Sequence, residues 1–187
     1  MTYHYIPLED FLTDYHTIEP TNEELQAFKA HLHTYLKRST QQDNEEYQKN
    51  EINDFLKKVF HYRINTKNQI DSAIYDDNKV KVIIEAKRIN NKNEFPKNKH
   101  NPLSKALCES VLYFLREYHK GNNEIKHIIL CNPIEFFIFD ADELKRFIDN
   151  KTIEQYYKNC DKKEGIKTST DKFYKDLESY LMGGGGE

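Results

Sequence analysis

The stretch from Ile70 to Arg88 constrains the fold of this chain more than any other. Two runs rich in β-branched residues flank the polar turn Asp76-Asp77-Asn78-Lys79, and this pattern predicts a β-hairpin. The second strand ends in a glutamate and a lysine, Glu85 and Lys87, separated by one alanine. Because side chains alternate between the two faces of a strand, these residues share one face, at positions roughly 7 Å apart. If the hairpin pairs in register, Asp71 on the first strand can approach Glu85.

Two carboxylates and a lysine at a strand end can carry out phosphodiester hydrolysis. Hard divalent cations such as Mg²⁺ prefer oxygen ligands and commonly take one or two carboxylates together with water and substrate phosphates. Asp71 and Glu85 could supply those carboxylates, and Lys87 could orient or deprotonate a metal-bound water that attacks the phosphate. A surface hairpin that carries an ordinary Glu/Lys pair is the alternative that the spacing leaves open.

Length and composition predict one polar domain with four parts. The chain has 187 residues, of which 32% are charged and 37% apolar, and this is enough to bury one core. We expect an N-terminal arm and helix over 1–44, an α/β core over 45–140, C-terminal helices over 141–182 and a flexible tail over 183–187. The net charge of −3 gives no global basic field that would indicate a nucleic-acid partner.

The cysteines and the hydropathy pattern indicate the compartment. The three cysteines lie far apart without C-x-x-C spacing, which argues against a zinc site and against a secreted disulfide framework. No apolar run approaches the ~20 residues of a membrane span, and the N-terminus has no signal-peptide pattern. We therefore expect a cytoplasmic protein with no membrane partner.

Hydrophobic periodicity predicts the remaining elements. An irregular arm over 1–20 precedes a helix that starts with the capping-box pattern Thr21-Asn22-Glu23-Glu24. Pro133 separates two strands, and the C-terminal helices are expected to wrap the sheet. The other helices and strands are expected at Glu45 to Phe60, Leu103 to His119, Ile125 to Asn132 and Glu135 to Asp140.

Polar residues on two of these helices are candidates for a site. Glu51 lies at the edge of the apolar stripe of its helix, about 90° from the centre of the stripe, where it could face the protein interior or solvent. On the helix that follows the hairpin, Glu109, Tyr113 and Arg116 lie opposite the apolar stripe. We expect these three residues at the surface; the alternative is that they line a cleft, if another element covers their face.

The chain has one strongly basic segment, from Lys87 to Lys105, in which Glu94 is the single acid. It directly follows the candidate catalytic lysine, where contacts to a DNA backbone would be needed. A solvated lysine-rich loop is the alternative. The residues expected to bind phosphate are Arg88, Lys92, Lys97, Lys99 and Lys105.

The hairpin residues resemble a known nuclease signature. Asp71, thirteen intervening residues and then Glu85-Ala86-Lys87 are similar to the PD-(D/E)xK motif, although Ile70 stands where the motif has proline. The predicted order of helix, strand, hairpin, helix, strand and strand is also that of the PD-(D/E)xK core. A more specific resemblance is to the N-terminal nuclease domain of type IIG restriction-modification enzymes. The segments that carry it are Ile70 to Ile74, Ile84 to Lys87, Ala106 to Glu117 and the strand exit Cys131-Asn132-Pro133.

The resemblance implies a restriction-endonuclease-like α/β fold, with a central mixed sheet of four to five strands flanked by helices. It also implies a Mg²⁺-dependent DNA endonuclease, with Mn²⁺ as a substitute, that cleaves double-stranded DNA as the cleavage domain of a restriction-modification system. In this reading Asp71 and Glu85 hold the metal, Lys87 acts on the water, and Glu51 is a possible third acid. A resolvase or repair nuclease, and a catalytically silent DNA-binding or assembly module of the same fold, are the alternatives.

The resemblance further implies missing partners. In type IIG enzymes the same polypeptide carries a DNA methyltransferase with an Asn-Pro-Pro-Tyr motif, but Asn132-Pro133-Ile134-Glu135 lacks the second proline and the aromatic residue. S-adenosylmethionine would therefore bind only to a methyltransferase part outside this sequence. Target recognition would also lie in a longer parent chain or a partner, and a transient dimer could make the double-strand cut.

Overall fold

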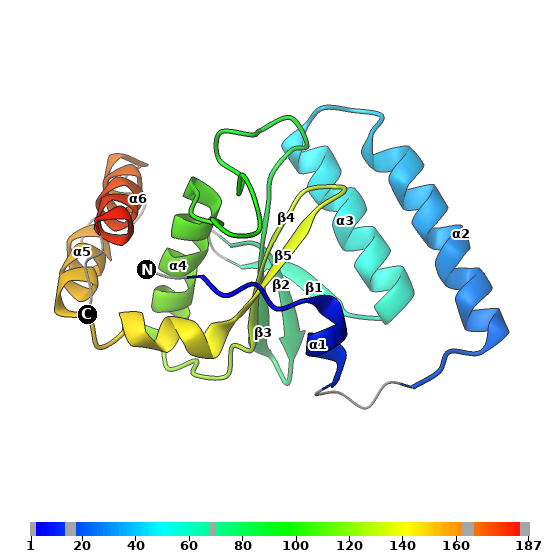
Figure 1. The fold of residues 1–187 in the computed structure, drawn as a ribbon, viewed down its shortest axis with the longest axis horizontal. Coiled ribbons are helices and arrows are strands. Elements are labelled where there is room, and N and C mark those ends of the chain that lie inside the picture. The colour runs from blue at the N-terminus through cyan, green and yellow to red at the C-terminus, as the bar shows by residue number, and fades with distance from the viewer. Residues whose placement is uncertain (1–2, 14–17, 68–69, 162–166, 184–187) are drawn as a thin grey trace.

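The computed structural model describes residues 3–13, 18–67, 70–161 and 167–183 (Figure 1). The tail expected over 183–187 lies, apart from Gly183, outside the described residues. Within them the chain is an α/β structure with one mixed sheet of five strands, in the order β1-β2-β3-β4-β5. The strands are β1 (Arg63–Lys67), β2 (Ile70–Asp76), β3 (Lys79–Ala86), β4 (His127–Cys131) and β5 (Phe136–Asp140). The expected mixed sheet of four to five strands flanked by helices is confirmed.

The β2–β3 hairpin forms as the sequence predicts. Asp77 and Asn78 occupy the turn with φ angles of 46° and 63°, and Asp and Asn are the non-glycine residues that tolerate this left-handed region best. The strands pair antiparallel, with Ser72 opposite Ile84. β3 then pairs in parallel with β4, with Ala86 opposite Cys131. The end of β3 therefore lies inside the sheet, between two neighbouring strands.

The helix α3 (Glu45–Phe60) lies against one face of the sheet, and α2 (Asn22–Ser39) packs on α3 (Figure 1). The predicted capping box at Thr21 is confirmed, because its side chain accepts a hydrogen bond from the Glu24 backbone while the Glu24 carboxylate accepts one from the Thr21 backbone. Apolar residues from α2, α3, β3 and β4 form a small core on this face: Tyr35, Ile52, Ile84, Ala86 and Cys131.

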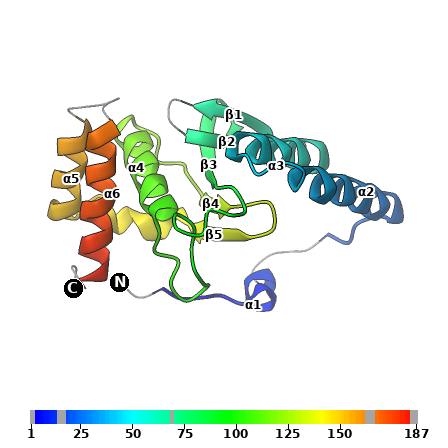
Figure 2. The ribbon, with the colours of Figure 1, turned by 90° about the horizontal axis from the view of Figure 1, so that it is seen from above.

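The opposite face carries α4 (Lys105–His119) and, beyond it, the C-terminal helices. These are the 3₁₀ helix η1 (Ala141–Phe147), α5 (Lys151–Asp161) and α6 (Lys167–Met182). The expectation that they wrap the sheet is wrong for α5 and α6, because α6 packs on α4 and α5 packs on α6 (Figure 2). The resulting order of layers is α5/α6, α4, sheet and α3/α2. Leu112, Leu115 and Leu177 are fully buried in the large core between these layers.

Other boundaries differ slightly from the expectation. The arm that we expected to be irregular contains the short helix α1 (Leu8–Thr13). Strand β4 ends and β5 begins one residue inside the predicted runs because the chain turns around Pro133, where Asn132 Oδ1 accepts hydrogen bonds from the backbones of Ile134 and Glu135. Strand β4 also begins two residues later than predicted, at His127. Cys108, Cys131 and Cys160 are buried, and none of the three forms a disulfide. Among the described helices, none combines the length and apolarity needed to cross a bilayer.

Candidate functional site

Glu85 and Lys87 lie together at the end of β3, buried in the protein. Their exposed fractions are 2% and 5%, and Lys87 Nζ lies 2.7 Å from Glu85 Oε1. Ile83, two residues before Glu85, belongs to the large core beside α4, whereas Ile84 and Ala86 belong to the small core beside α3. Glu85 and Lys87 thus share the α4 face, as strand alternation predicts. The alternative of an exposed surface hairpin is wrong.

A second buried carboxylate, on α4, contacts Lys87. Glu109 Oε2 lies 2.7 Å from Lys87 Nζ, and Glu109 is 8% exposed. We expected Glu109, Tyr113 and Arg116 at the surface, and this expectation is wrong because α6 covers their face of α4. Their spacing of four and three residues puts them on one polar face opposite the apolar stripe, a pattern typical of a solvated helix face, so the sequence carried no signal that α6 covers it.

Asp71 stands across the hairpin from Glu85. Since Ser72 pairs with Ile84, the next step along the antiparallel ladder brings Asp71 opposite Glu85. Lys49 on α3 reaches the same carboxylate, with its Nζ 3.5 Å from Asp71 Oδ1 and 2.5 Å from Glu46 Oε2. The sequence reasoning missed Lys49, because a lysine on an amphipathic helix resembles any solvated one.

The environment changes the pKa of each of these groups. Burial raises the pKa of Glu85 well above its ordinary value; the Lys87 charge opposes this rise, and the Asp71 and Glu109 carboxylates reinforce it. Burial by itself would lower the pKa of Lys87, but the Glu85 and Glu109 carboxylates raise it overall. Burial alone would also lower the pKa of Lys49, but the Glu46 and Asp71 carboxylates outweigh burial and raise it. Both lysines are therefore charged at neutral pH.

The carboxylates of this cluster have unused capacity for a cation. Asp71, Glu85 and Glu109 face two lysines, and Glu85 Oε2 is buried without a hydrogen bond to any described residue. A buried acceptor without a partner calls for an explanation, and a bound ion is one. Among the described residues, no three His, Cys, Asp or Glu side chains are arranged to enclose a metal. Two carboxylates completed by water and phosphate nevertheless suit Mg²⁺, so Asp71 and Glu85 fit that ion.

Glu51 lies in a different environment from the one the resemblance implies. It is buried, and its Oε1 accepts a hydrogen bond of 2.8 Å from Arg38 Nη2 on α2. The α3 residue that contacts Asp71 is Lys49, and the further acid that contacts Lys87 is Glu109. The structure thus brings Asp71, Glu85 and Lys87 together and gives Glu51 a partner at the α2–α3 interface.

The predicted phosphate-binding residues divide into two groups. Arg88 lies 3.5 Å from Asp43, Lys99 lies 4.1 Å from the centre of the Tyr5 ring, and Lys105 Nζ lies 2.5 Å from Glu94 Oε1. These three side chains already contact protein groups. The side chains of Lys92 and Lys97 are exposed to solvent.

Comparison with known proteins assigns the chain to one family. The family model described as "Domain of unknown function (DUF7149)" matches residues 6–183, so the chain belongs to that family. No curated protein and no solved structure matches the chain.

Proposed function

We propose that this domain is a Mg²⁺-dependent DNA endonuclease of the PD-(D/E)xK type, which hydrolyses phosphodiester bonds. The observation that carries the proposal is the buried contact of Glu85 with Lys87 at the end of a central strand, beside Asp71 on the antiparallel neighbour. The mixed sheet, in which β3 and β4 run parallel through the crossover helix α4, supports the restriction-endonuclease-like core.

Each residue of the cluster has a role in this proposal. Asp71 and Glu85 would hold Mg²⁺, or Mn²⁺ in its place. The ion would supply Lewis-acid stabilisation of the charge that develops on the phosphate. Lys87 would hold the attacking water in line with the phosphate, and Glu109 would fix the direction of the Lys87 ammonium through their 2.7 Å contact.

The proposal includes the substrate and the partners that the resemblance implies. Double-stranded DNA would lie along the loop after β3, where Lys92 and Lys97 are exposed to contact phosphates. Target recognition and the methyltransferase, with its S-adenosylmethionine, would belong to a longer parent chain or a partner. A transient dimer in the cytoplasm would make the double-strand cut.

Metal-dependent cleavage of a plasmid and a labelled duplex tests the proposal. We expect cleavage with Mg²⁺ or Mn²⁺ and none with EDTA. Asp71→Asn, Glu85→Gln and Lys87→Met should each lower the rate by about 10²-fold or more, because each removes a group that acts on the developing charge. Glu51→Gln, at the α2–α3 interface, is the matched acid control and should keep its rate. Circular dichroism melting must show that each variant is folded.

Calorimetric titration separates the proposal from the silent-module alternative. A nuclease should bind Mn²⁺ with an affinity that Asp71→Asn and Glu85→Gln reduce and Glu51→Gln leaves unchanged. A wild-type protein that neither binds the metal nor cuts DNA would support the silent module of the same fold.

A further inference from the structure

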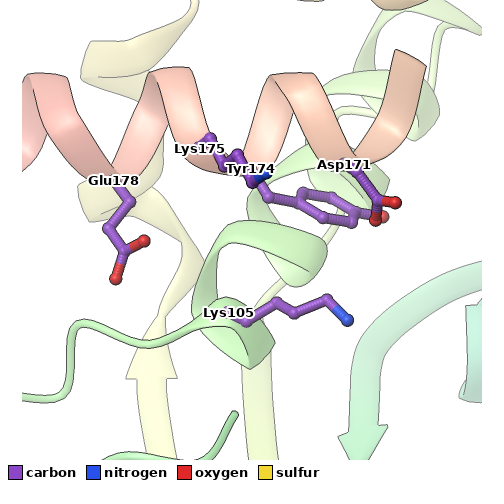
Figure 3. Close-up of a pocket in the computed structure, with 5 residues that line it drawn as sticks. All are labelled: Lys105, Asp171, Tyr174, Lys175 and Glu178. Carbon is purple, nitrogen blue, oxygen red and sulfur yellow. The ribbon is translucent and has the colours of Figure 1, made fainter. Parts of the chain in front are cut away.

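A cavity of ≈ 280 Å³ lies between the start of α4 and α6. Figure 3 shows its lining residues, one from α4 and four from a single face of α6. Their spacing along α6 of three, one and three residues places them on adjacent turns. The lining residues are Lys105, Asp171, Tyr174, Lys175 and Glu178. None of the four α6 residues has a role in the proposed catalysis.

The cavity adjoins the candidate catalytic site. Lys105, on its α4 wall, lies 3.8 Å from Glu109 Oε1, and Glu109 in turn contacts Lys87 at 2.7 Å. Tyr174 is buried, and its pKa is raised first by that burial and then by the Glu109 and Glu85 carboxylates. The Tyr174 hydroxyl therefore stays protonated and can donate a hydrogen bond. A ligand in the cavity would lie one side chain away from the carboxylates of the site.

The lining has the chemistry of a nucleotide site. Lys175 can bind a phosphate. Lys105, although it pairs with Glu94, adds positive charge on the facing wall, and the positive end of the α4 helix dipole is opposed by no acidic residue in the first turn. Asp171 and Glu178 can accept hydrogen bonds from base amino groups, as carboxylates do at base edges. A ligand that satisfies this lining needs both an anionic group and N–H donors. A nucleotide has both, whereas a bare phosphate has only the anionic group. The volume lies just below the usual range for small-molecule pockets, so it fits one nucleotide and no duplex.

We propose that this cavity binds a single deoxynucleotide of the cleaved strand, next to the scissile phosphate. The phosphate of that nucleotide lies between Lys105 and Lys175, and the base edge meets either Asp171 or Glu178, which lie on opposite sides of Lys175 along α6. The inference rests on the proposed endonuclease function for the identity of the strand, but binding of the nucleotide needs neither metal nor cleavage.

Amide NMR titrations of the metal-free protein test this inference. The probes are the four deoxynucleoside 5′-monophosphates, the corresponding deoxynucleosides and inorganic phosphate. We expect the shifts to concentrate at the start of α4 and along α6, with at least one monophosphate binding about tenfold more tightly than either partial probe. Lys175→Gln should weaken that binding about tenfold, the cost of one charge-assisted hydrogen bond.

Lys172→Gln is the matched control, because Lys172 is on the same helix, pairs with Asp176 and lies outside the cavity lining. Its variant should bind as the wild type does. Equal affinity for inorganic phosphate, equal losses in Lys172→Gln and Lys175→Gln, or shifts scattered over the surface would each overturn the inference. Cleavage without nucleotide binding overturns only this inference. Nucleotide binding without any metal-dependent cleavage overturns the proposed function and leaves the cavity as a nucleotide site.

Discussion

The helices α3 and α4 flank opposite faces of the same hairpin, but they are buried to very different degrees. Every residue of α4 from Ala106 to Glu117 is buried, whereas α3 buries only a few, among them Lys49 and Glu51. The reason is that α4 lies between the sheet and α6, while α2 covers the far side of α3 along part of its length (Figure 2). A helix covered on both sides leaves its polar side chains no route to water.

This difference decides how each helix contributes to the candidate site. On α4, Glu109 must find a partner inside the protein, and that partner is Lys87. On α3, Lys49 reaches Asp71 while it also contacts the exposed carboxylate of Glu46. Glu109 on α4 therefore fixes the position of the Lys87 ammonium. Lys49 on α3 places a positive charge beside Asp71 and can shift between Asp71 and Glu46.

The largest expected effect comes from core truncation on the two helices. Leu112→Ala on α4 should cost about 3–4 kcal/mol of unfolding free energy, because Leu112 is fully buried between two layers. Leu56→Ala on α3 should cost about 1–2 kcal/mol, since Leu56 is only partly buried. Urea denaturation followed by circular dichroism measures both costs. Equal costs would contradict the difference in packing between the two helices.

The next effect compares two buried carboxylates. Glu109→Gln should cost about 2 kcal/mol, because Lys87 keeps Glu85 but loses one of its two carboxylates in a buried site. Glu51→Gln should cost less than about 1 kcal/mol, because its partner Arg38 is half-exposed. Thermal melting at matched pH is the measurement. A larger loss for Glu51→Gln would show that the α2–α3 interface is the more sensitive of the two.

The smallest effect concerns the helix caps. Ser104 Oγ accepts a hydrogen bond from the Leu107 backbone at the buried start of α4, and Asn44 Oδ1 accepts one from the Tyr47 backbone at the exposed start of α3. Ser104→Ala should cost about 1–2 kcal/mol and Asn44→Ala about 0.5–1 kcal/mol. Chemical denaturation resolves the difference when both variants are measured together. If Asn44→Ala were the more costly, burial would not govern cap strength here.

The sequence by itself determined the hairpin, the helices that follow the apolar stripes, and the shared face of Glu85 and Lys87. These features depend on local rules: turn residues that tolerate positive φ at Asp77 and Asn78, and side-chain alternation along a strand. The approach of Asp71 to Glu85 does not follow from the turn alone. A register shift between Ile74 and Tyr75 moves Asp71 from a position opposite Ile84 to one opposite Glu85. Local geometry was sufficient for the other features because they depend on residues close in the chain.

Only the tertiary structure decided that Glu109 belongs beside Lys87, that Lys49 reaches Asp71 and that Glu51 pairs with Arg38. Each contact joins separate elements, and periodicity shows which face of a helix is polar but does not show what covers that face. For α4 the covering element is α6, which begins 48 residues after α4 ends. Packing of that helix turned an apparently solvated polar stripe into the wall of the candidate site.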